Sequence, residues 1–189
     1  MRVVIERGHG PYDSGAVGPT GLTEFEVTQA LCKRLRDMGY EVKGRDKLLS
    51  VLLWALRLNK PDVVVSIHCN AGSKTRHECQ VYHWRYEPNV EVYMQSQALA
   101  NAIADRARGF FAEKASVQWF PVLVQGKHGL ERRTPGIVKG TAKLAAVVVE
   151  TGFISCPHTE EAMRTESWRD RAALAIHEGI QDWRKAKGG

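Results

Sequence analysis

The chain has 189 residues, enough for one domain with a sizeable core, and its hydrophobic fraction of 43% and charged fraction of 25% are ordinary for a globular protein. Its apolar runs fall short of the ~20 residues that cross a bilayer, so we expect no integral membrane association. The formal net charge is +6. That charge suits an anionic partner, but it suits simple solubility equally well, because the basic residues are scattered in pairs.

The four cysteines form no C-x-x-C pair, and a chain of this size does not need a disulfide scaffold, so we expect reduced, mostly structural thiols. Residues 1–6 lack a charged segment followed by an apolar stretch of ~7–15 residues. We therefore predict a protein that is made in the cytoplasm without a signal peptide.

Apolar periodicity and glycine or proline breaks predict the elements in chain order. The first half reads as a buried strand at 3–5, a glycine-rich loop over 7–23, a helix over 24–38, a short strand at 40–42, a helix between 46 and 59, and strands at 62–68 and 79–84. The second half reads as a helix over 92–115, a strand over 117–124, irregular chain over 126–143, a buried strand at 145–150 and a helix over 159–185.

The strands at 3–5, 62–68 and 145–150 are apolar throughout and alternate with helices. Continuous apolar strands are typical of a parallel sheet that is covered on both faces. We therefore predict a single α/β domain over residues 1–189, with a mostly parallel central sheet and helices on both faces.

Polar side chains stand at the carboxyl ends of these three buried strands, as His9, His68 and Glu150. Parallel strands bring their carboxyl ends to one edge of the sheet, where function gathers in such folds. Glu24 opens the first predicted helix, which begins at that same edge. The sequence order therefore predicts two imidazoles and two carboxylates in one crevice.

Two histidines and a carboxylate form a common catalytic zinc set that leaves a position open for water. A second carboxylate outside the metal shell can take a proton from that water and pass it on, and Glu150 suits this role. Each residue also has an ordinary interpretation. A histidine at a strand end is often only hydrogen-bonded, Glu24 or its neighbour Glu26 can complement a helix dipole, and Glu150 can be a strand-end carboxylate.

Three stretches resemble the zinc-dependent N-acetylmuramoyl-L-alanine amidases of bacterial cell-wall hydrolases and phage endolysins. They are GHGPYDSGAVGPTGLTE (8–24), PDVVVSIHCNAG (61–72) and AAVVVETGFIS (145–155). The family pattern has GHG with Asp-x-Gly-Ala after it, then a Glu, a Ser-Ile-His-x-Asn strand end and a late Glu-x-Gly-Phe. All of these motifs occur here in order, and the resemblance covers essentially the whole chain.

The resemblance implies that His9, Glu24 and His68 bind one Zn²⁺ per chain and that Glu150 is the catalytic carboxylate. Glu24 is preferred over the nearby Glu26 because it follows Gly21-Leu22 in the register of the motif. No other cofactor is implied.

A few positions depart from the family pattern or carry a smaller role. Cys69 stands where a small residue is common, and we expect it to face the core, since neighbours on a strand point to opposite faces. Asn70 matches the Asn of the family, and we expect it to organise the following loop. Pro11 replaces a frequent glycine. Residues 125–143 match least well, and we expect a solvated loop there, with His128, Arg132 and Arg133 as alternative contacts to an anionic polymer.

The resemblance implies hydrolysis of the amide bond between N-acetylmuramic acid and L-alanine of peptidoglycan, by a monomer with no separate wall-binding domain. A phage or prophage lysin, released onto the wall from the cytoplasm, fits these expectations. The alternatives are a zinc peptidase that cleaves within the stem peptide, an inactive wall-binding module and a basic nucleic-acid-binding domain. The scattered charge and the lack of a recognition motif argue against nucleic acid as a partner.

Overall fold

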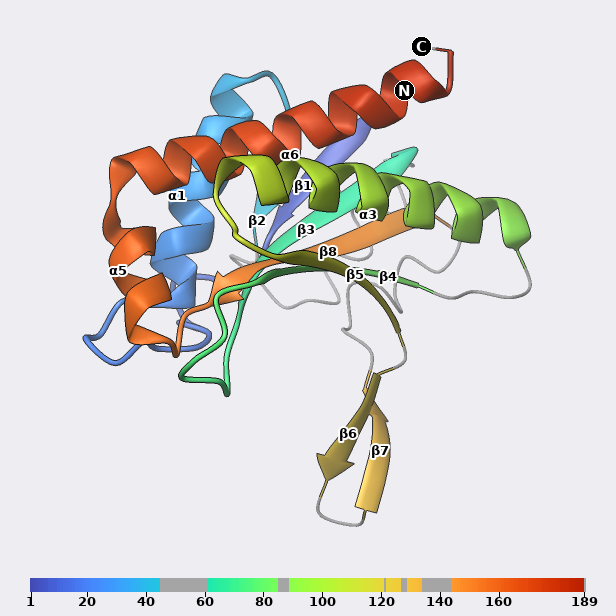
Figure 1. The fold of residues 1–189 in the computed structure, drawn as a ribbon. Coiled ribbons are helices and arrows are strands. Elements are labelled where there is room, and N and C mark those ends of the chain that lie inside the picture. Colours follow the sequence, from blue (N-terminus) through green and yellow to red (C-terminus); the bar gives the residue numbers. More distant parts are fainter. Residues whose placement is uncertain (45–60, 85–88, 121, 127–128, 134–143, 189) are drawn as a thin grey trace.

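The structure is a computed structural model, and it describes residues 1–44, 61–84, 89–120, 122–126, 129–133 and 144–188. Its centre is a six-stranded sheet with the strand order β2-β1-β3-β8-β4-β5 (Figure 1). The strands are β1 (Val3–Arg7), β2 (Glu41–Gly44), β3 (Val63–Asn70), β4 (Cys79–Trp84), β5 (Ala115–Phe120) and β8 (Ala145–Phe153).

The sheet is mostly parallel, as the sequence predicts. Strands β2, β1, β3 and β8 run in one direction, while β4 runs antiparallel to β8 and parallel to β5. Strand β8 comes last in the chain but lies between β3 and β4. This placement brings the carboxyl-terminal halves of β1, β3 and β8 side by side.

Alternate residues of the central strands face a helical layer. Val63, Val65 and Ile67 of β3 belong to the hydrophobic core, and so does Cys69, which confirms that this thiol packs away from His68. All four cysteines are buried and free. The residues between these positions point to the opposite face of the sheet, because side chains alternate along a strand.

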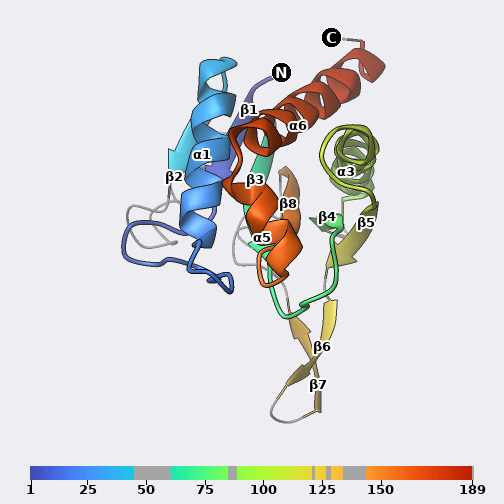
Figure 2. The same ribbon diagram turned by 60° about the vertical axis from the view of Figure 1, so that its left-hand side comes forward.

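Among the described residues, four helices accompany the sheet: α1 (Glu24–Asp37), α3 (Val90–Phe110), α5 (Pro157–Arg164) and α6 (Glu166–Ala186). Helix α6 contacts both α1 and α3, and together these three helices cover one face of the sheet (Figures 1 and 2). The helix expected between residues 46 and 59 lies outside the described residues. Within the described ranges, no helix is both long and apolar enough to cross a membrane.

The helix predicted over 159–185 is in fact two helices, and that prediction is wrong at one point. Helix α5 ends at Arg164, and Thr165 in an extended conformation begins α6. The Thr165 hydroxyl accepts a hydrogen bond from the backbone N–H of Trp168 at 3.2 Å. An N-cap threonine competes with continued helix, because its side chain satisfies a backbone donor of the next helix.

The strand predicted over 117–124 is also two strands. The central sheet ends with β5, and a separate antiparallel hairpin of β6 (Val122–Gly126) and β7 (Gly129–Arg133) projects from the domain (Figure 1). The prediction of irregular chain over 126–143 is therefore wrong for residues 129–133. Residues 127–128 and 134–143, which include His128, lie outside the described part of the chain.

Candidate metal centre

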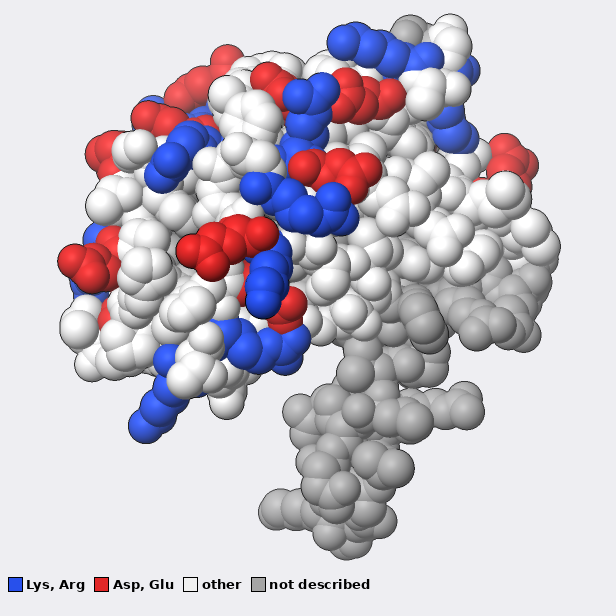
Figure 3. Space-filling view, in the orientation of Figure 1, with Lys and Arg blue, Asp and Glu red and all other residues white. Residues whose placement is uncertain are grey.

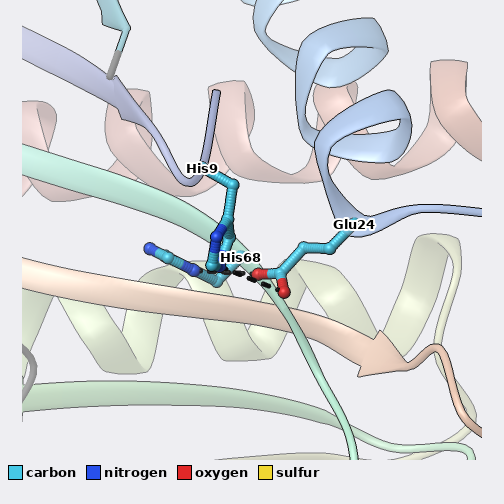
Figure 4. Close-up of side chains that lie close together, drawn as sticks. All are labelled: His9, Glu24 and His68. Atoms are coloured by element: carbon cyan, nitrogen blue, oxygen red, sulfur yellow. Dashed lines mark hydrogen bonds and ion pairs between the residues drawn. The ribbon is translucent and has the colours of Figure 1, made fainter. Parts of the chain in front are cut away.

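Three predicted ligands come together from three separate elements (Figure 4). His9 follows β1, Glu24 is the first residue of α1, and His68 lies on β3. One oxygen of Glu24 lies 2.9 Å from Nδ1 of His68, and the other lies 3.2 Å from Nε2 of His9. The three ligand atoms all lie within 4.8 Å of one another, a spacing that suits a shared metal ion.

The glycine-rich loop allows this close approach. A Cβ atom on Gly15, whose φ is +66°, would stand 2.6 Å from Oε2 of Glu24 and 2.7 Å from Cδ2 of His9. A Cβ atom on Gly8 would stand 2.5 Å from Cε1 of His68. His9 itself has a φ of +60°, which is uncommon for a residue other than glycine. The site therefore depends on glycines at positions that touch the three side chains.

The start of α1 places its two early glutamates in different surroundings. Thr23 caps the helix by accepting from the backbone N–H of Glu26 at 3.2 Å, and the carboxylate of Glu26 accepts from the backbone N–H of Thr23 at 2.8 Å. This reciprocal capping box occupies Glu26 at the helix end. Glu24 is buried instead, and its carboxylate points at the two histidines.

Hydrogen bonds keep the carboxylate of Glu24 ionised. Burial acts to raise the pKa of Glu24, but hydrogen bonds with His68 and His9 outweigh burial and hold it well below the usual range. The backbone N–H groups of Ala16 and Cys69 also donate to this carboxylate, each at 3.0 Å. Glu24 is thus an anion that is fixed between two imidazoles.

The two imidazoles hold protons more tightly than free histidine. The hydrogen bond that His9 donates to Glu24 raises the pKa of His9. Burial lowers the pKa of His68, but Glu24 together with the charges of Glu150 and Glu6 leaves it raised. Excess negative charge around two imidazoles favours a cation between them, whether it is a proton or a metal ion.

Glu150 lies directly beside the histidine of β3. It is paired in register with His68 across the β3–β8 ladder. Its Oε2 is inaccessible to solvent and has no hydrogen-bond partner among the described residues. Burial raises the pKa of Glu150 to about 7, so this carboxylate can exchange a proton near neutral pH.

The donor set fits a metal such as zinc. Two imidazole nitrogens and one carboxylate oxygen converge from separate elements. Next to them stands Glu150, whose solvent-inaccessible Oε2 has no hydrogen-bond partner among the described residues. This composition matches a catalytic site with three protein ligands rather than a closed structural site. No other group of three such side chains converges in this way among the described residues.

Asn70 organises the loop after β3, as expected. Its side-chain oxygen accepts from the backbone N–H of Ala71 at 2.8 Å, and its amide donates to Gln80 on β4 at 2.8 Å. Arg132 and Arg133 lie on β7, where the structure describes the backbone alone. Their contacts stay a prediction.

Two contributors near the site have no predicted role in the sequence. The carboxylate of Asp13 accepts a hydrogen bond from Nδ1 of His9 at 2.8 Å and so lies behind that side chain. Glu160 of α5 is buried and accepts hydrogen bonds from the backbone N–H groups of Thr20 and Leu22, at 3.0 to 3.1 Å. We call this second contact the Glu160 clasp. It holds the loop that leads into Glu24, and about 140 residues separate its two sides, so local sequence gives no indication of it.

Comparison with known proteins gives one consistent result. Residues 3–182 match the family described as N-acetylmuramoyl-L-alanine amidase (Amidase_3). The chain is 29% identical to the N-acetylmuramoyl-L-alanine amidase LytC of Bacillus subtilis over 94% of its length, and 27% identical to AmiC of Neisseria meningitidis over 95%. It spans 34% and 51% of the length of these two relatives.

Solved structures show the same fold. The amidase AmiC2 of Nostoc punctiforme superposes with a TM-score of 0.76 at 19% identity, covering 98% of this chain and 97% of that one. The catalytic domain of CwlV from Bacillus (Paenibacillus) polymyxa superposes with a TM-score of 0.70 at 25% identity, covering 98% and 99%.

Proposed function

Because the chain belongs to the N-acetylmuramoyl-L-alanine amidase family, we propose that it hydrolyses the amide bond between N-acetylmuramic acid and L-alanine in peptidoglycan. The observation that carries the proposal is the convergence of His9, Glu24 and His68 beside Glu150, whose Oε2 is inaccessible to solvent. This arrangement would supply a metal site and a proton carrier at one point, which are the parts that metal-assisted amide hydrolysis uses.

His9, Glu24 and His68 would hold a single zinc ion. When bound, zinc supplies a Lewis acid that polarises the substrate carbonyl and acidifies water. The hydrogen bonds from Ala16 and Cys69 keep the carboxylate of Glu24 oriented toward the two histidines. The backbone of the chain therefore orients the ligand set.

Glu150 would carry the proton. Its carboxylate accepts a proton from the attacking water and returns it to the nitrogen of the departing L-alanine, which leaves as an amine. Burial raises the pKa of Glu150 to about 7 in the metal-free site. A carboxylate whose pKa is raised by burial holds a proton more readily than an exposed one and can still give it up, which suits both halves of this transfer. The buried Oε2 of Glu150 has no competing partner among the described residues.

We also propose that residues 1–189 act as one catalytic domain, as a monomer, on the wall after release from the cytoplasm, in the manner of a phage or prophage lysin. The support for a single domain is that the alignments with AmiC2 and CwlV cover 97% of each chain or more. Peptidoglycan is the expected partner.

The test measures metal content and wall hydrolysis together. Purified protein should contain one zinc ion per chain and clear a suspension of peptidoglycan. Glu150→Gln should keep the zinc and lose clearing by about 100-fold or more. The exposed Glu113→Gln serves as the matched control and should behave like the unchanged protein.

Mass spectrometry of the digest identifies the bond. Glycan strands released together with intact stem peptides support the amidase reaction. Fragments cut within the stem peptide would instead assign the chain to stem-peptide cleavage. Protein without zinc, or a Glu150→Gln variant as active as the unchanged protein, would contradict the proposed mechanism.

A further inference from the structure

Glu6 is a carboxylate in an unexpected place. It lies in β1 after three apolar residues, and it is completely buried. Burying a carboxylate is costly unless nearby groups compensate its charge. The Ser66 hydroxyl on β3 donates to Oε2 of Glu6, and Nε2 of His68 lies 4.0 Å from that same oxygen. A buried residue with these neighbours requires an explanation beyond packing.

The position of Glu6 follows from the register of the sheet. Glu6 is paired with Ser66, and His68 is two residues further along β3, so all three side chains point to the same face. This is the face opposite the helical layer, and it is the face on which Glu150 stands beside His68. Glu6 therefore lies behind the metal site rather than in the hydrophobic core.

The imidazole of His68 lies between two carboxylates. Nδ1 is 2.9 Å from Glu24, on the side of the other predicted ligands, whereas Nε2 is turned toward Glu6. A neutral imidazole carries its proton on one nitrogen and can bind a metal ion through the other. The position of the proton on His68 therefore decides which nitrogen is free for a metal.

We propose that Glu6 is a positioning residue for His68: its buried carboxylate keeps the proton on Nε2, which leaves Nδ1 free to bind zinc. This inference rests on the proposed zinc chemistry and adds a residue to it. A carboxylate behind a ligand histidine fixes the tautomer and the ring orientation and makes the imidazole a stronger ligand. Ser66 holds Glu6 in place by donating to the same oxygen.

The other ligand histidine has a similar arrangement, which supports the inference independently. Asp13 lies 2.8 Å from Nδ1 of His9, while Nε2 of His9 faces Glu24. Each imidazole thus turns one nitrogen to the ligand set and the other to an outer carboxylate. The side chain of Asp13 is 64% exposed and that of Glu6 is 0% exposed, so water screens Asp13 but not Glu6.

The main test is the zinc affinity of Glu6→Gln, measured by competition with a coloured chelator. Glutamine keeps the shape of the side chain and an acceptor for Ser66 but removes the charge, so we expect the dissociation constant for zinc to rise 10- to 100-fold. Glu41→Gln on the neighbouring strand β2 is the matched control, because Glu41 is paired with Arg2 and Lys43 away from the site. A dissociation constant within about twofold of the unchanged protein would overturn the inference, since a packing role alone leaves zinc affinity unaltered.

A second measurement needs no variant. Nitrogen-15 NMR of the zinc-loaded protein reports the state of each ring nitrogen of His68, and we expect a metal-bound Nδ1 and a protonated Nε2 whose proton exchanges slowly with water. A metal-bound Nε2 would overturn the inference while leaving the proposed amidase function intact. If the unchanged protein bound no zinc at all, both this inference and the metal chemistry of the proposed function would fail. The NMR measurement therefore separates a failure of this inference alone from a failure of the proposed function.

Discussion

At the scale of a single residue, the burial that raises the pKa of Glu150 also makes its ionised form costly for stability. Its pKa rises from an ordinary value of 4.5 to about 7 because folding buries it. A group with a raised pKa in the folded state binds its proton more tightly there than in the unfolded chain. Stability from this group is therefore present below about pH 4.5 and is lost as pH rises through about 7.

Because the ionised carboxylate is costly in the folded state, we predict that Glu150→Gln stabilises the metal-free protein at high pH. The rise of the Glu150 pKa from 4.5 to about 7 corresponds to at most about 3 kcal/mol in the free energy of unfolding. We expect a gain of this order near pH 8 and almost none near pH 4, measured by urea unfolding of both proteins at each pH. An equal gain at the two pH values would show that charge burial is not its cause.

Two glycines allow the geometry of the site to be tested against backbone strain. Gly15 and Gly21 both have positive φ, but a Cβ atom on Gly15 would collide with Glu24 and His9, whereas one on Gly21 would meet nothing within 4 Å. We expect both alanine variants to lose about 1 kcal/mol of stability from strain. Only Gly15→Ala should also weaken zinc binding, by 10-fold or more, as measured by chelator competition. Equal zinc affinities in the two variants would contradict a role for the Gly15 contact.

The four main side chains of the site could be placed from sequence because the topology of the sheet determines where the strands end. Parallel strands share one carboxyl edge, so His9, His68 and Glu150 had to meet, with Glu24 at the start of the following helix. Their catalytic and ligand roles remain predictions. Glu6 could not be placed in the same way, because its importance depends on Ser66 and His68, which lie about 60 residues away in the sequence.

At the scale of elements, the Glu160 clasp connects α5 to the loop that precedes α1. The carboxylate accepts from Thr20 and Leu22, and a Cβ atom on Gly18 would stand 2.5 Å from it. The hydrogen bonds lower the pKa of Glu160 against the opposing effect of burial. The loop before α1 is therefore attached to α5, which lies about 140 residues later in the sequence.

We predict that Glu160→Gln loosens the loop. Glutamine accepts hydrogen bonds through one oxygen instead of two, so the amides of Thr20 and Leu22 should exchange hydrogen faster, and the free energy of unfolding should fall by about 1–3 kcal/mol. Hydrogen exchange followed by NMR measures the first effect and urea unfolding the second. Glu161→Gln, an exposed neighbour on the same helix, should change neither quantity. Unchanged exchange at Thr20 and Leu22 would show that the loop holds its shape without the clasp.

Element boundaries were harder to predict than element types. The apolar period continues through Thr165, so it indicates one helix where the capping hydroxyl makes two. The sequence pattern does not indicate the hairpin of β6 and β7, for a different reason. Its strands pair with each other and not with the central sheet, and local sequence does not say where one strand ends and the next begins.

At the scale of the whole molecule, Figure 3 shows how charged side chains are distributed over one face. On the face shown in Figure 3, Lys and Arg alternate with Asp and Glu. Arg34 of α1, for example, pairs with Glu166 and Asp170 of α6, and Arg106 of α3 pairs with Asp182. This face presents no single basic patch, so the net charge of +6 acts there as a diffuse attraction to anionic polymers.

Zinc should stabilise the whole domain, because its proposed ligands come from three elements that fold together. We expect excess chelator to lower the melting temperature, by an amount that grows with the ratio of zinc concentration to its dissociation constant. Differential scanning calorimetry with and without chelator measures this shift. His68→Ala should melt at the same temperature under both conditions, and a shift that persists in this variant would place the stabilising metal elsewhere.

The position of β8 in the sheet has a consequence for the timing of synthesis. The chain emerges from the ribosome with the residues of β1, α1 and β3 first, so all three proposed metal ligands are made within the first 68 residues. The strand that carries Glu150 is made much later and must then enter between β3 and β4. A prematurely terminated chain therefore carries all three proposed ligands without the proposed proton carrier. We expect a chain that ends before residue 145 to lack wall hydrolysis, because the strand that places Glu150 beside His68 is absent from it.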